Sequence, residues 1–355
     1  MNISIKELHL SNYRNFDNLR LKLSSDQIII TGNNGIGKTN ILEAISFLSP
    51  GRGLRYAKLD EISKEGQSWR AGATIHTTLG LAEIDTKYDI ISAKRTTEFN
   101  GKKISNTELA NFASIVWLTP QMEGLFLGPS SDRRRFLDRA CYAFYPLHAS
   151  LINQYDHALR ERLKILESSE GNNEWLDIVE EKISRLAFQI NKNRVSVIAK
   201  LQNALDNLDN LFPKARLVLE PNYEGLDVSW IQSEFKNARK KDLATGRSNF
   251  GIHRSDLIVY YRDKDTLTKH CSTGEQKAML ISVTIAQIMA KQAEGVDGPI
   301  MLLDETFVHL DETRREYLAD FIKSSSSQVW ITSAEPFALG YFKSAQVIEL
   351  AGSGM

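Results

Sequence analysis

The chain has 355 residues, of which 42% are hydrophobic and 25% are charged, a composition that is ordinary for a globular protein. Its 44 Lys and Arg residues balance its 44 Asp and Glu residues. Bulk charge therefore gives no argument for a nucleic acid or a membrane as a partner, and any such surface must be a local patch. The length suits one large domain or two modest ones.

The cysteine content and the absence of apolar runs predict the compartment. Cys141 and Cys271 lie far apart in the chain and lack metal-ligand spacing. This argues against a disulfide framework or a zinc site and favours a reducing compartment. No stretch reaches the ~18 consecutive apolar residues of a membrane span, and the N-terminus has no signal-peptide core. We expect a cytoplasmic protein that has no membrane partner.

The first third of the chain predicts strands interrupted by one helix. Apolar and polar residues alternate in "ISIKELHL" and "LRLKL", and the apolar run "QIII" follows. Helical spacing then appears in "TNILEAISFLS", which ends at "SPG". Residues 69–104 again predict strands, with a hairpin turn at Asn100 and Gly101. "SIVWLTP" at 114–120 predicts one more buried strand.

Residues 131–212 have helical periodicity. An apolar stripe runs along this segment, and its members are Leu186, Ile190, Val197, Leu201, Leu205, Leu208 and Leu211. The stripe is too short for an extended coiled coil. We interpret the segment as a helical subdomain that packs a core of its own.

The last third returns to alternating strands and helices. "ARLVLEP" and "DLIVYYRD" predict strands, and a helix, the strand "GPIMLLDE", another helix and the strand "QVWITS" follow. Such alternation builds a parallel sheet. The order α/β, helical, α/β is best explained by a helical segment inserted into one α/β unit. The predicted parts are residues 1–120, the mainly helical 121–245, and 246–355.

Residues 32–39 match the P-loop pattern G-x-x-x-x-G-K-[ST], between an apolar strand and an amphipathic helix. Its glycines let backbone N–H groups turn toward a phosphate, and the helix N-terminus adds further donors. Lys38 is expected to reach the β- and γ-phosphates, and the Thr39 hydroxyl to bind Mg²⁺. The predicted ATP-binding residues are Gly32, Asn33, Asn34, Gly35, Ile36, Gly37, Lys38, Thr39 and Asn40.

A second acidic element is needed to hold the metal, and "IMLLDET" supplies it. Its apolar strand ends in Asp304, which is expected at the carboxyl edge of the sheet, where ligands bind. We predict Thr39 and Asp304 as Mg²⁺ ligands. The adjacent Glu305 is expected to orient or deprotonate the attacking water, so Glu305 and Lys38 are the predicted catalytic residues.

"STGEQK" opens a helix, with Ser272 as N-cap and Glu275 completing a capping box. By itself it predicts only a helix cap. Together with the P-loop it resembles the signature motif of ABC-type ATPases, commonly S-G-G-Q. Ser272, Gly274 and Gln276 match that motif, whereas Thr273 and Glu275 depart from it. The resemblance implies that these three residues contact the γ-phosphate of ATP held by a partner subunit, and that ATP joins two chains.

The same resemblance extends to two further elements of the ATPase site. It implies that Gln121 in "LTPQMEGLF" reaches the metal. In the family, the loop after the metal-binding acidic pair ends in Leu-Asp, which Leu310 and Asp311 match here.

Over essentially its whole length the chain resembles the bacterial RecF family of SMC-like, ABC-type ATPases. The segments that carry the resemblance are "LHLSNYRNF", "GNNGIGKTN", "SPGRGLR", "GPSSDRRRFLDR", "GIHRSDL", "STGEQK" and "LLDETFVHLD". The family commonly has Asp-Asp where this chain has Asp304-Glu305, and Glu where His309 stands. "ITSAEP" lacks the switch histidine of transporter ATPases, so the residue that senses the γ-phosphate is undefined.

This resemblance implies a weak, DNA-stimulated ATPase that serves as a switch. It implies binding to double-stranded or gapped DNA as an ATP-dependent homodimer, and work with RecR and RecO to bring RecA to single-stranded gaps in repair and replication restart. The alternative is a nucleotide-gated, SMC-like scaffold that acts mainly through protein partners. A small-molecule kinase would explain neither the signature motif nor the helical insertion.

The sequence offers several candidate contact residues, each with a structural alternative. The basic segments 132–139 and 236–241 could neutralise DNA phosphates. Alternatively, the arginines of the first segment could form ion pairs at the base of the arm, and the second segment could be a solvated face. Arg14 and Asn15 could contact the nucleotide or form a plain turn. His253 and Arg254 could line the site or join the arm to the core.

Overall fold

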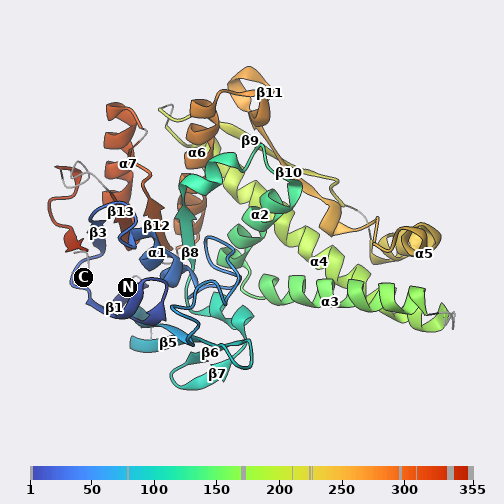
Figure 1. Cartoon of the computed structure of the whole chain (residues 1–355). Helices are drawn as coiled ribbons and strands as arrows, with labels where there is room; N and C mark the ends of the chain where they lie inside the picture. The colour runs from blue at the N-terminus through green and yellow to red at the C-terminus, as the bar shows by residue number, and fades with distance from the viewer. Residues whose placement is uncertain are drawn as a thin grey trace.

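The computed structural model describes residues 3–77, 80–168, 173–209, 211–223, 225, 227–295, 298–308, 310–333 and 340–350. Two parts are distinct in Figure 1: a head that contains the large sheets, and an arm of helices that projects from it. The chain builds one side of the head, then the arm, and then returns to the head. This order confirms the predicted insertion of a helical segment into an α/β unit.

The N-terminal part of the head is a six-stranded antiparallel sheet in the order β2-β1-β4-β5-β6-β7. The predicted hairpin turn lies between β6 and β7, where Asn100 and Gly101 both have positive φ, at 48° and 73°. Its strands are β1 (Ser4–Tyr13), β2 (Phe16–Lys22), β4 (Trp69–Thr77), β5 (Gly80–Asp89), β6 (Lys94–Phe99) and β7 (Lys102–Ile104).

The centre of the head is a five-stranded parallel sheet in the order β14-β3-β13-β12-β8. Its strands other than β14 are largely buried on both faces, and alternate residues of β12 pack into different cores: Met301 and Leu303 into one, Ile300 and Leu302 into the other. The parallel pairing brings the carboxyl ends of these strands to one edge. The strands are β3 (Gln27–Thr31), β8 (Ile115–Leu118), β12 (Ile300–Asp304), β13 (Val329–Thr332) and β14 (Gln346–Glu349).

Helices and a small sheet complete the two cores of the head. α1 (Lys38–Ser46) packs with the antiparallel sheet on one face of the parallel sheet, and α6 (Thr273–Gln292) and α7 (Glu312–Ser324) pack on the other. The small antiparallel sheet contains β9 (Ala215–Glu220), β10 (Asp256–Tyr261) and β11 (Thr266–Leu267). Short 3-10 helices are η1 (Asn106–Asn111), η2 (Pro120–Gly124), η3 (Ile252–Arg254), η4 (Arg262–Lys264) and η5 (Thr268–His270).

The arm is built from α2 (Ser130–Phe144), α3 (His148–Glu167), α4 (Asn173–Asp206) and α5 (Val228–Thr245). A core of its own joins α3, the first half of α4 and α5. Within it Arg162 is fully buried and forms ion pairs with Glu180 at 2.8 Å and Asp242 at 2.6 Å, so that one guanidinium links the three helices. Helix α5 is not among the predicted elements.

The prediction that the apolar stripe packs a core of its own is wrong for its second half. Leu186 and Ile190 lie in the arm core, but Val197, Leu201, Leu205 and Leu208 lie in the core of the head beside α6. The reason is the length of α4, because 34 residues extend about 50 Å and pass from the arm into the head. Leu211, at the end of the stripe, is 42% exposed.

Buried ion pairs fix the base of the arm. Arg194 of α4 donates to both carboxylate oxygens of Asp138 in α2, at 2.8 and 2.9 Å, and His148 of α3 lies 3.0 Å from the same carboxylate. Burial alone would raise the pKa of Asp138, but the charge of Arg194 and the bonds from His148 and Arg194 hold it below its ordinary value. Three helices are therefore tied to one carboxylate.

The arginines at 133–135 make contacts within the chain, as the structural alternative for this segment predicts. Arg133 pairs with Asp256 of β10 through two bonds of 2.8 and 2.7 Å, and Arg135 pairs with Asp132. Arg134 donates to the Ser255 carbonyl at 2.7 Å. The prediction of ion pairs at the base of the arm is confirmed for Arg133 and Arg135.

Among the helices of the described ranges, none is long and apolar enough to cross a membrane.

Candidate nucleotide-binding site

The P-loop connects the carboxyl end of β3 to the first turn of α1. Gly37 is the N-cap of α1 and has φ 114°, a left-handed value that favours glycine. A Cβ atom at this position would lie 2.6 Å from the Asn15 side chain and 2.8 Å from the Phe16 ring. The glycine is therefore required both by the turn and by the close approach of the β1–β2 hairpin.

Lys38 places its ammonium inside this loop. Its Nζ donates to the carbonyl oxygens of Gly32 at 2.7 Å and Asn33 at 3.1 Å, and the residue is only 5% exposed. Asn33, Asn34 and Gly35 at the tip of the loop are exposed. A buried positive charge thus lies beside an exposed glycine-rich turn at a helix N-terminus, an arrangement that favours anions.

Asp304 lies where the sequence predicts it, at the carboxyl end of β12, and its side chain is bonded across the edge of the sheet. The Thr39 Oγ1 lies 2.9 and 3.1 Å from its two carboxylate oxygens, and the Thr332 Oγ1 donates to one of them at 2.7 Å. Asp304 is 6% exposed. Hydroxyl and carboxylate oxygens are the hard donors that Mg²⁺ prefers, so this set fits the predicted metal.

Thr332 is a site residue that the sequence reasoning did not identify. It ends β13, which lies between β3 and β12 in the sheet, so its side chain reaches Asp304 at the end of the neighbouring strand. A threonine at the end of the apolar run "VWIT" was the available signal. Its position became informative only with the strand order.

Glu305 follows Asp304 in a left-handed conformation, with φ 49°. Such backbone costs a non-glycine residue on the order of 1 kcal/mol and is held by its surroundings, here by the bond from its N–H to Thr332 Oγ1 at 3.1 Å. Within the described part of the chain its carboxylate has no hydrogen-bond or ion-pair partner. The predicted role of Glu305 in activating water remains a prediction that this geometry favours.

Asn15 holds the P-loop through side-chain bonds. Its Nδ2 donates to the Ile36 carbonyl at 2.6 Å, and its Oδ1 accepts from Asn40 Nδ2 at 2.8 Å. Arg55 in turn donates to Asn40 Oδ1 at 2.7 Å. A chain of bonds therefore runs from the loop to the segment after α1.

Arg14 is used differently, although it precedes Asn15. Its guanidinium donates to both carboxylate oxygens of the buried Glu43, at 2.8 and 2.7 Å. The hydrogen bond to Glu43 raises the pKa of Arg14. The structural interpretation of Arg14, a turn held by an ion pair, is the one that the geometry supports.

The signature segment caps α6 as predicted. The Ser272 and Glu275 side chains form the reciprocal capping box. The Lys264 hydrogen bond, together with bonds from the Ser272 backbone and side chain, lowers the pKa of Glu275 to about 2. Ser272, Thr273 and Gly274 are exposed, whereas Gln276 is buried and donates to the Cys271 carbonyl at 2.9 Å.

The structure does not bring this segment to the P-loop of the same chain. In Figure 1 the first turn of α6 follows β11, apart from the turn between β3 and α1. Ser272 and Gly274 are therefore available to another molecule, while Gln276 supports its own loop.

The remaining predicted residues lie around this edge or in the arm. Gln121 is exposed in η2, just beyond the carboxyl end of β8. Asp311 is the N-cap of α7 and accepts from the Arg314 N–H at 3.0 Å, and Leu310 is buried. His309 and residues 334–339, which include the second half of "ITSAEP", lie outside the described residues.

The two other candidate contact segments are partly structural. His253 lies 3.0 Å from the Tyr155 hydroxyl of α3, so it joins the arm to the core, and Arg254 is exposed. In the segment 236–241, Lys236 and Arg239 form ion pairs within the arm, whereas Lys240 and Lys241 are exposed.

Comparison with known proteins identifies relatives along the whole chain. A family model described as the RecF/RecN/SMC N terminal domain matches residues 4–346. The chain is 47% identical to the DNA replication and repair protein RecF of Rickettsia akari (strain Hartford), over 98% of this chain and 99% of that protein. It is 46% identical to the protein of the same name from Rickettsia prowazekii (strain Madrid E), with the same coverage.

Solved structures show the same fold. The recombination mediator protein RecF with ATP, described as part of the RecFOR pathway, superposes with a TM-score of 0.84 at 22% identity, over 94% of this chain and 92% of that chain. The SMC head domain of Pyrococcus furiosus bound to the C-terminal domain of ScpA gives a TM-score of 0.56 at 16% identity, over 98% and 93%. The predicted fold, an ABC-type P-loop ATPase head with an inserted helical arm, is confirmed, and the chain belongs to the RecF/RecN/SMC N-terminal domain family and, within it, to the RecF family.

Proposed function

We propose that this protein is an ATP-dependent DNA-binding protein of recombinational repair and replication restart, which hydrolyses ATP slowly and uses it as a switch. The observation that carries the proposal is the set formed by the P-loop, Thr39 and Asp304 at one edge of the parallel sheet, together with a signature segment that is exposed and separate from it. A nucleotide site divided in this way is complete only when two chains meet.

The residues of one half-site have distinct roles. The P-loop backbone and Lys38 would hold the phosphates of ATP, and Thr39 and Asp304 would hold Mg²⁺, with Gln121 approaching from the neighbouring strand end. Bound Mg²⁺ supplies charge neutralisation of the phosphate oxygens. Glu305, whose carboxylate is unpaired within the described residues, would orient the attacking water.

The second half-site would come from a partner subunit. Ser272 and Gly274 are exposed at the N-terminus of α6, whose unpaired backbone donors favour a phosphate. The buried Gln276 would support this turn rather than contact the nucleotide. ATP would thus join two copies of the chain, and hydrolysis would separate them.

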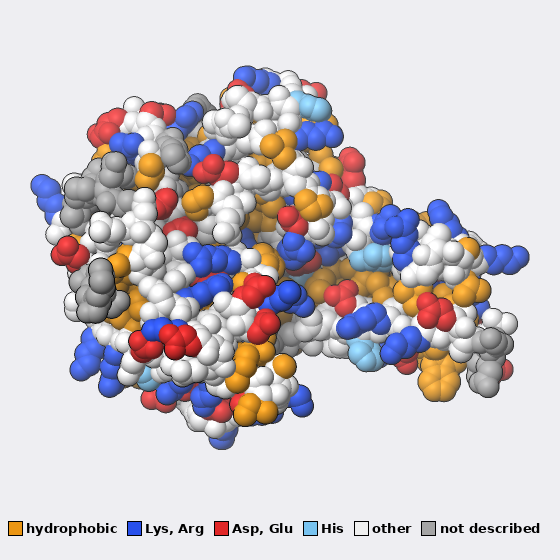
Figure 2. Space-filling view, in the orientation of Figure 1, with side chains coloured by type: hydrophobic (Ala, Val, Ile, Leu, Met, Phe, Trp, Pro, Cys, Tyr) orange, Lys and Arg blue, Asp and Glu red, His pale blue; other side chains and the backbone are white. Residues whose placement is uncertain are grey.

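The relatives' description as DNA replication and repair proteins supports DNA as the ligand of the closed dimer, and the RecFOR pathway named for a solved relative supports RecR and RecO as partners. RecA is the further partner that the family resemblance implies. Figure 2 shows basic and acidic side chains intermingled on the visible face, so charge of one sign does not mark a DNA path on that face. Exposed lysines at 240 and 241 and Arg254 are candidate backbone contacts. We propose that duplex DNA runs across the two heads and contacts these exposed residues of their arms.

Fluorescence anisotropy of a labelled gapped duplex, with and without ATP–Mg²⁺ and over a series of salt concentrations, tests this proposal. We expect binding that requires ATP and weakens steeply with salt, since phosphate contacts release counterions. Duplex binding that is insensitive to ATP, together with ATP-dependent capture of RecR or RecO, would instead establish the nucleotide-gated scaffold.

A further inference from the structure

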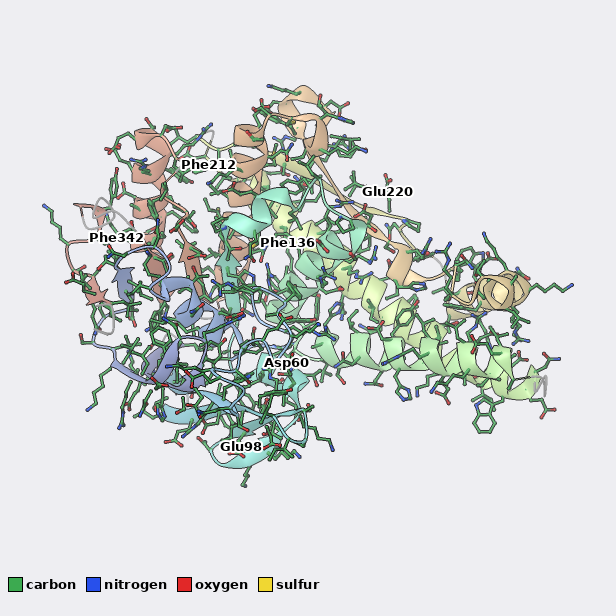
Figure 3. The ribbon with its side chains drawn as sticks, in the orientation of Figure 1. Asp60, Glu98, Phe136, Phe212, Glu220 and Phe342 are labelled. Carbon is green, nitrogen blue, oxygen red and sulfur yellow. The ribbon has the colours of Figure 1, made fainter. Side chains whose placement is uncertain are left out.

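A cavity of about 240 Å³ lies where the arm leaves the head. Its walls come from three separate parts of the chain: the segment after α1, the end of β8 with η2, and helix α2. Leu54 and Trp117 in its wall belong to one core of the head, whereas Leu125 and Phe136 belong to the other. Figure 3 labels Phe136, which lies on α2 near the centre of the molecule. The cavity therefore occupies the seam between the two cores.

Arg139 supplies an unbalanced positive charge to this cavity. Its guanidinium lies 3.8 Å from the centre of the buried Trp117 ring and 5.6 Å from that of Phe136. Its Nε and Nη2 atoms are buried without a hydrogen-bond partner, and no carboxylate of the described residues pairs with it. Burial lowers the pKa of Arg139. A hydrogen bond with the Tyr56 side chain opposes this effect only in part. A bound anion would offset the remaining cost, because a desolvated cation that lacks a counter-anion is unfavourable.

The mouth of the cavity carries a second stack of a cation on an aromatic ring. The guanidinium of Arg135 lies 4.8 Å from the centre of the Tyr56 ring, and both side chains are exposed. Tyr56 has φ 54°, which a large side chain rarely adopts and which often marks a functional position. Asp132 also lines the cavity and pairs with Arg135, so three arginines face one carboxylate among the lining residues.

The cavity adjoins the candidate nucleotide site without sharing the P-loop. Gln121, the predicted metal-reaching residue, lines it. Arg55 lines it as well and donates to Asn40, which is bonded to Asn15 and through it to the loop. A ligand in the cavity would therefore contact the elements that position the P-loop.

We propose that this cavity binds one unpaired nucleotide of a DNA strand, with its phosphate at Arg139 and Arg135 and its base against Tyr56. The assignment rests on the proposed DNA-binding function and adds to it a site that a duplex does not reach. The volume is too small for a base pair, whereas arginine and aromatic side chains together are the usual means of holding single-stranded nucleotides. The site lies between the two cores, so binding of a DNA strand there would be coupled to the way in which the two cores of the head pack together.

The test uses the full-length protein with saturating ATP–Mg²⁺, so that the P-loop is filled. Anisotropy compares a short oligo-dT with a blunt duplex for the wild type, Arg135→Gln, Tyr56→Asn and Arg139→Gln. Tyr56→Asn removes the ring and retains a residue that tolerates positive φ. Arg185→Gln is the matched control, because Arg185 is an exposed arginine that pairs with Glu181 on the same helix, away from the cavity. A probe with 5-iododeoxyuridine is photocrosslinked, and the modified residue is mapped by mass spectrometry.

We expect the three cavity variants to bind oligo-dT about tenfold more weakly, which is the effect of losing one base stack or phosphate contact. The control variant and the binding of duplex by all variants should remain within about twofold of the wild type, and the crosslink should map to Tyr56. Arg135 and Tyr56 are exposed, so their variants test the site even if Arg139→Gln disturbs folding.

Three results would overturn the assignment. Cavity variants that bind oligo-dT as the wild type does, while duplex binding persists, would refute the cavity and leave the proposed function intact. Displacement of oligo-dT by inorganic phosphate as effectively as by thymidine monophosphate, at equal ionic strength, would show a bare anion site. A wild type that binds neither DNA would refute both proposals.

Discussion

The substitution Asp138→Asn tests the ion pairs that fix the arm to the head. In the wild type, one carboxylate accepts two bonds from Arg194 and one from His148. Asparagine has nearly the same size as aspartate but carries no charge. Its NH₂ group can only donate, and it would face a donating N–H group of Arg194 or His148. Arg194, which is 2% exposed, would remain as a buried cation without an anion.

The expected loss is about 3–5 kcal/mol in the free energy of unfolding, the range found when one partner of a buried ion pair is removed. The sign of the pH dependence follows from the lowered pKa of Asp138. Its ionised form is favoured in the folded state, so this stability is fully present above the unfolded pKa of about 3.9 and is lost as the pH falls below it. The difference between wild type and variant should thus shrink as the pH falls below about 4.

Urea unfolding followed by circular dichroism measures this difference, with Asp320→Asn as the matched control. Asp320 pairs with Lys323 on the surface of α7, where such pairs contribute at most about 1 kcal/mol. A loss of less than about 1 kcal/mol in Asp138→Asn, or a difference that grows as the pH falls below about 4, would refute the role assigned to this carboxylate.

Four further substitutions test the candidate site. Lys38→Met should weaken ATP binding at least about tenfold in calorimetry, because a charge-assisted phosphate contact is lost; unchanged affinity would contradict its role. Ser272→Arg should leave ATP binding by the monomer intact and abolish the ATP-dependent dimer in sedimentation. Glu305→Gln should slow phosphate release and prolong the dimer, and unchanged turnover would place water activation elsewhere. Thr332→Val should lower the melting temperature, since a hydroxyl bond to the buried Asp304 is worth about 1 kcal/mol, and equal stability would argue against that contact.

Elements that are determined by residues close together in the chain can be predicted from the sequence. The P-loop follows from glycines placed between an apolar strand and a helix, and the capping box from Ser272 and Glu275 three residues apart. Helix α5 has comparable local signals at both of its ends. Asp227 caps its first turn by accepting from Trp230, and Gly246 ends it with φ 62°.

Features that depend on the tertiary arrangement could not be predicted in the same way. Thr332 stands beside Asp304 because β13 lies between β3 and β12, and strand order is not encoded in any one segment. The second half of α4 has the same apolar spacing as the first, so periodicity alone could not separate the residues of the arm from those of the head. The cavity needs Tyr56, Trp117 and Arg139 together, and they come from three separate segments.

The most direct test of the ATP switch is analytical sedimentation of the purified protein with and without ATP–Mg²⁺, each with and without a gapped duplex. We predict a monomer without nucleotide, a dimer with ATP–Mg²⁺, and a complex of the dimer with DNA only when both ligands are present. Ser272→Arg should remain monomeric throughout. A wild type that stays monomeric with ATP and DNA, or a Ser272→Arg variant that dimerises as readily as the wild type, would contradict the composite ATP site.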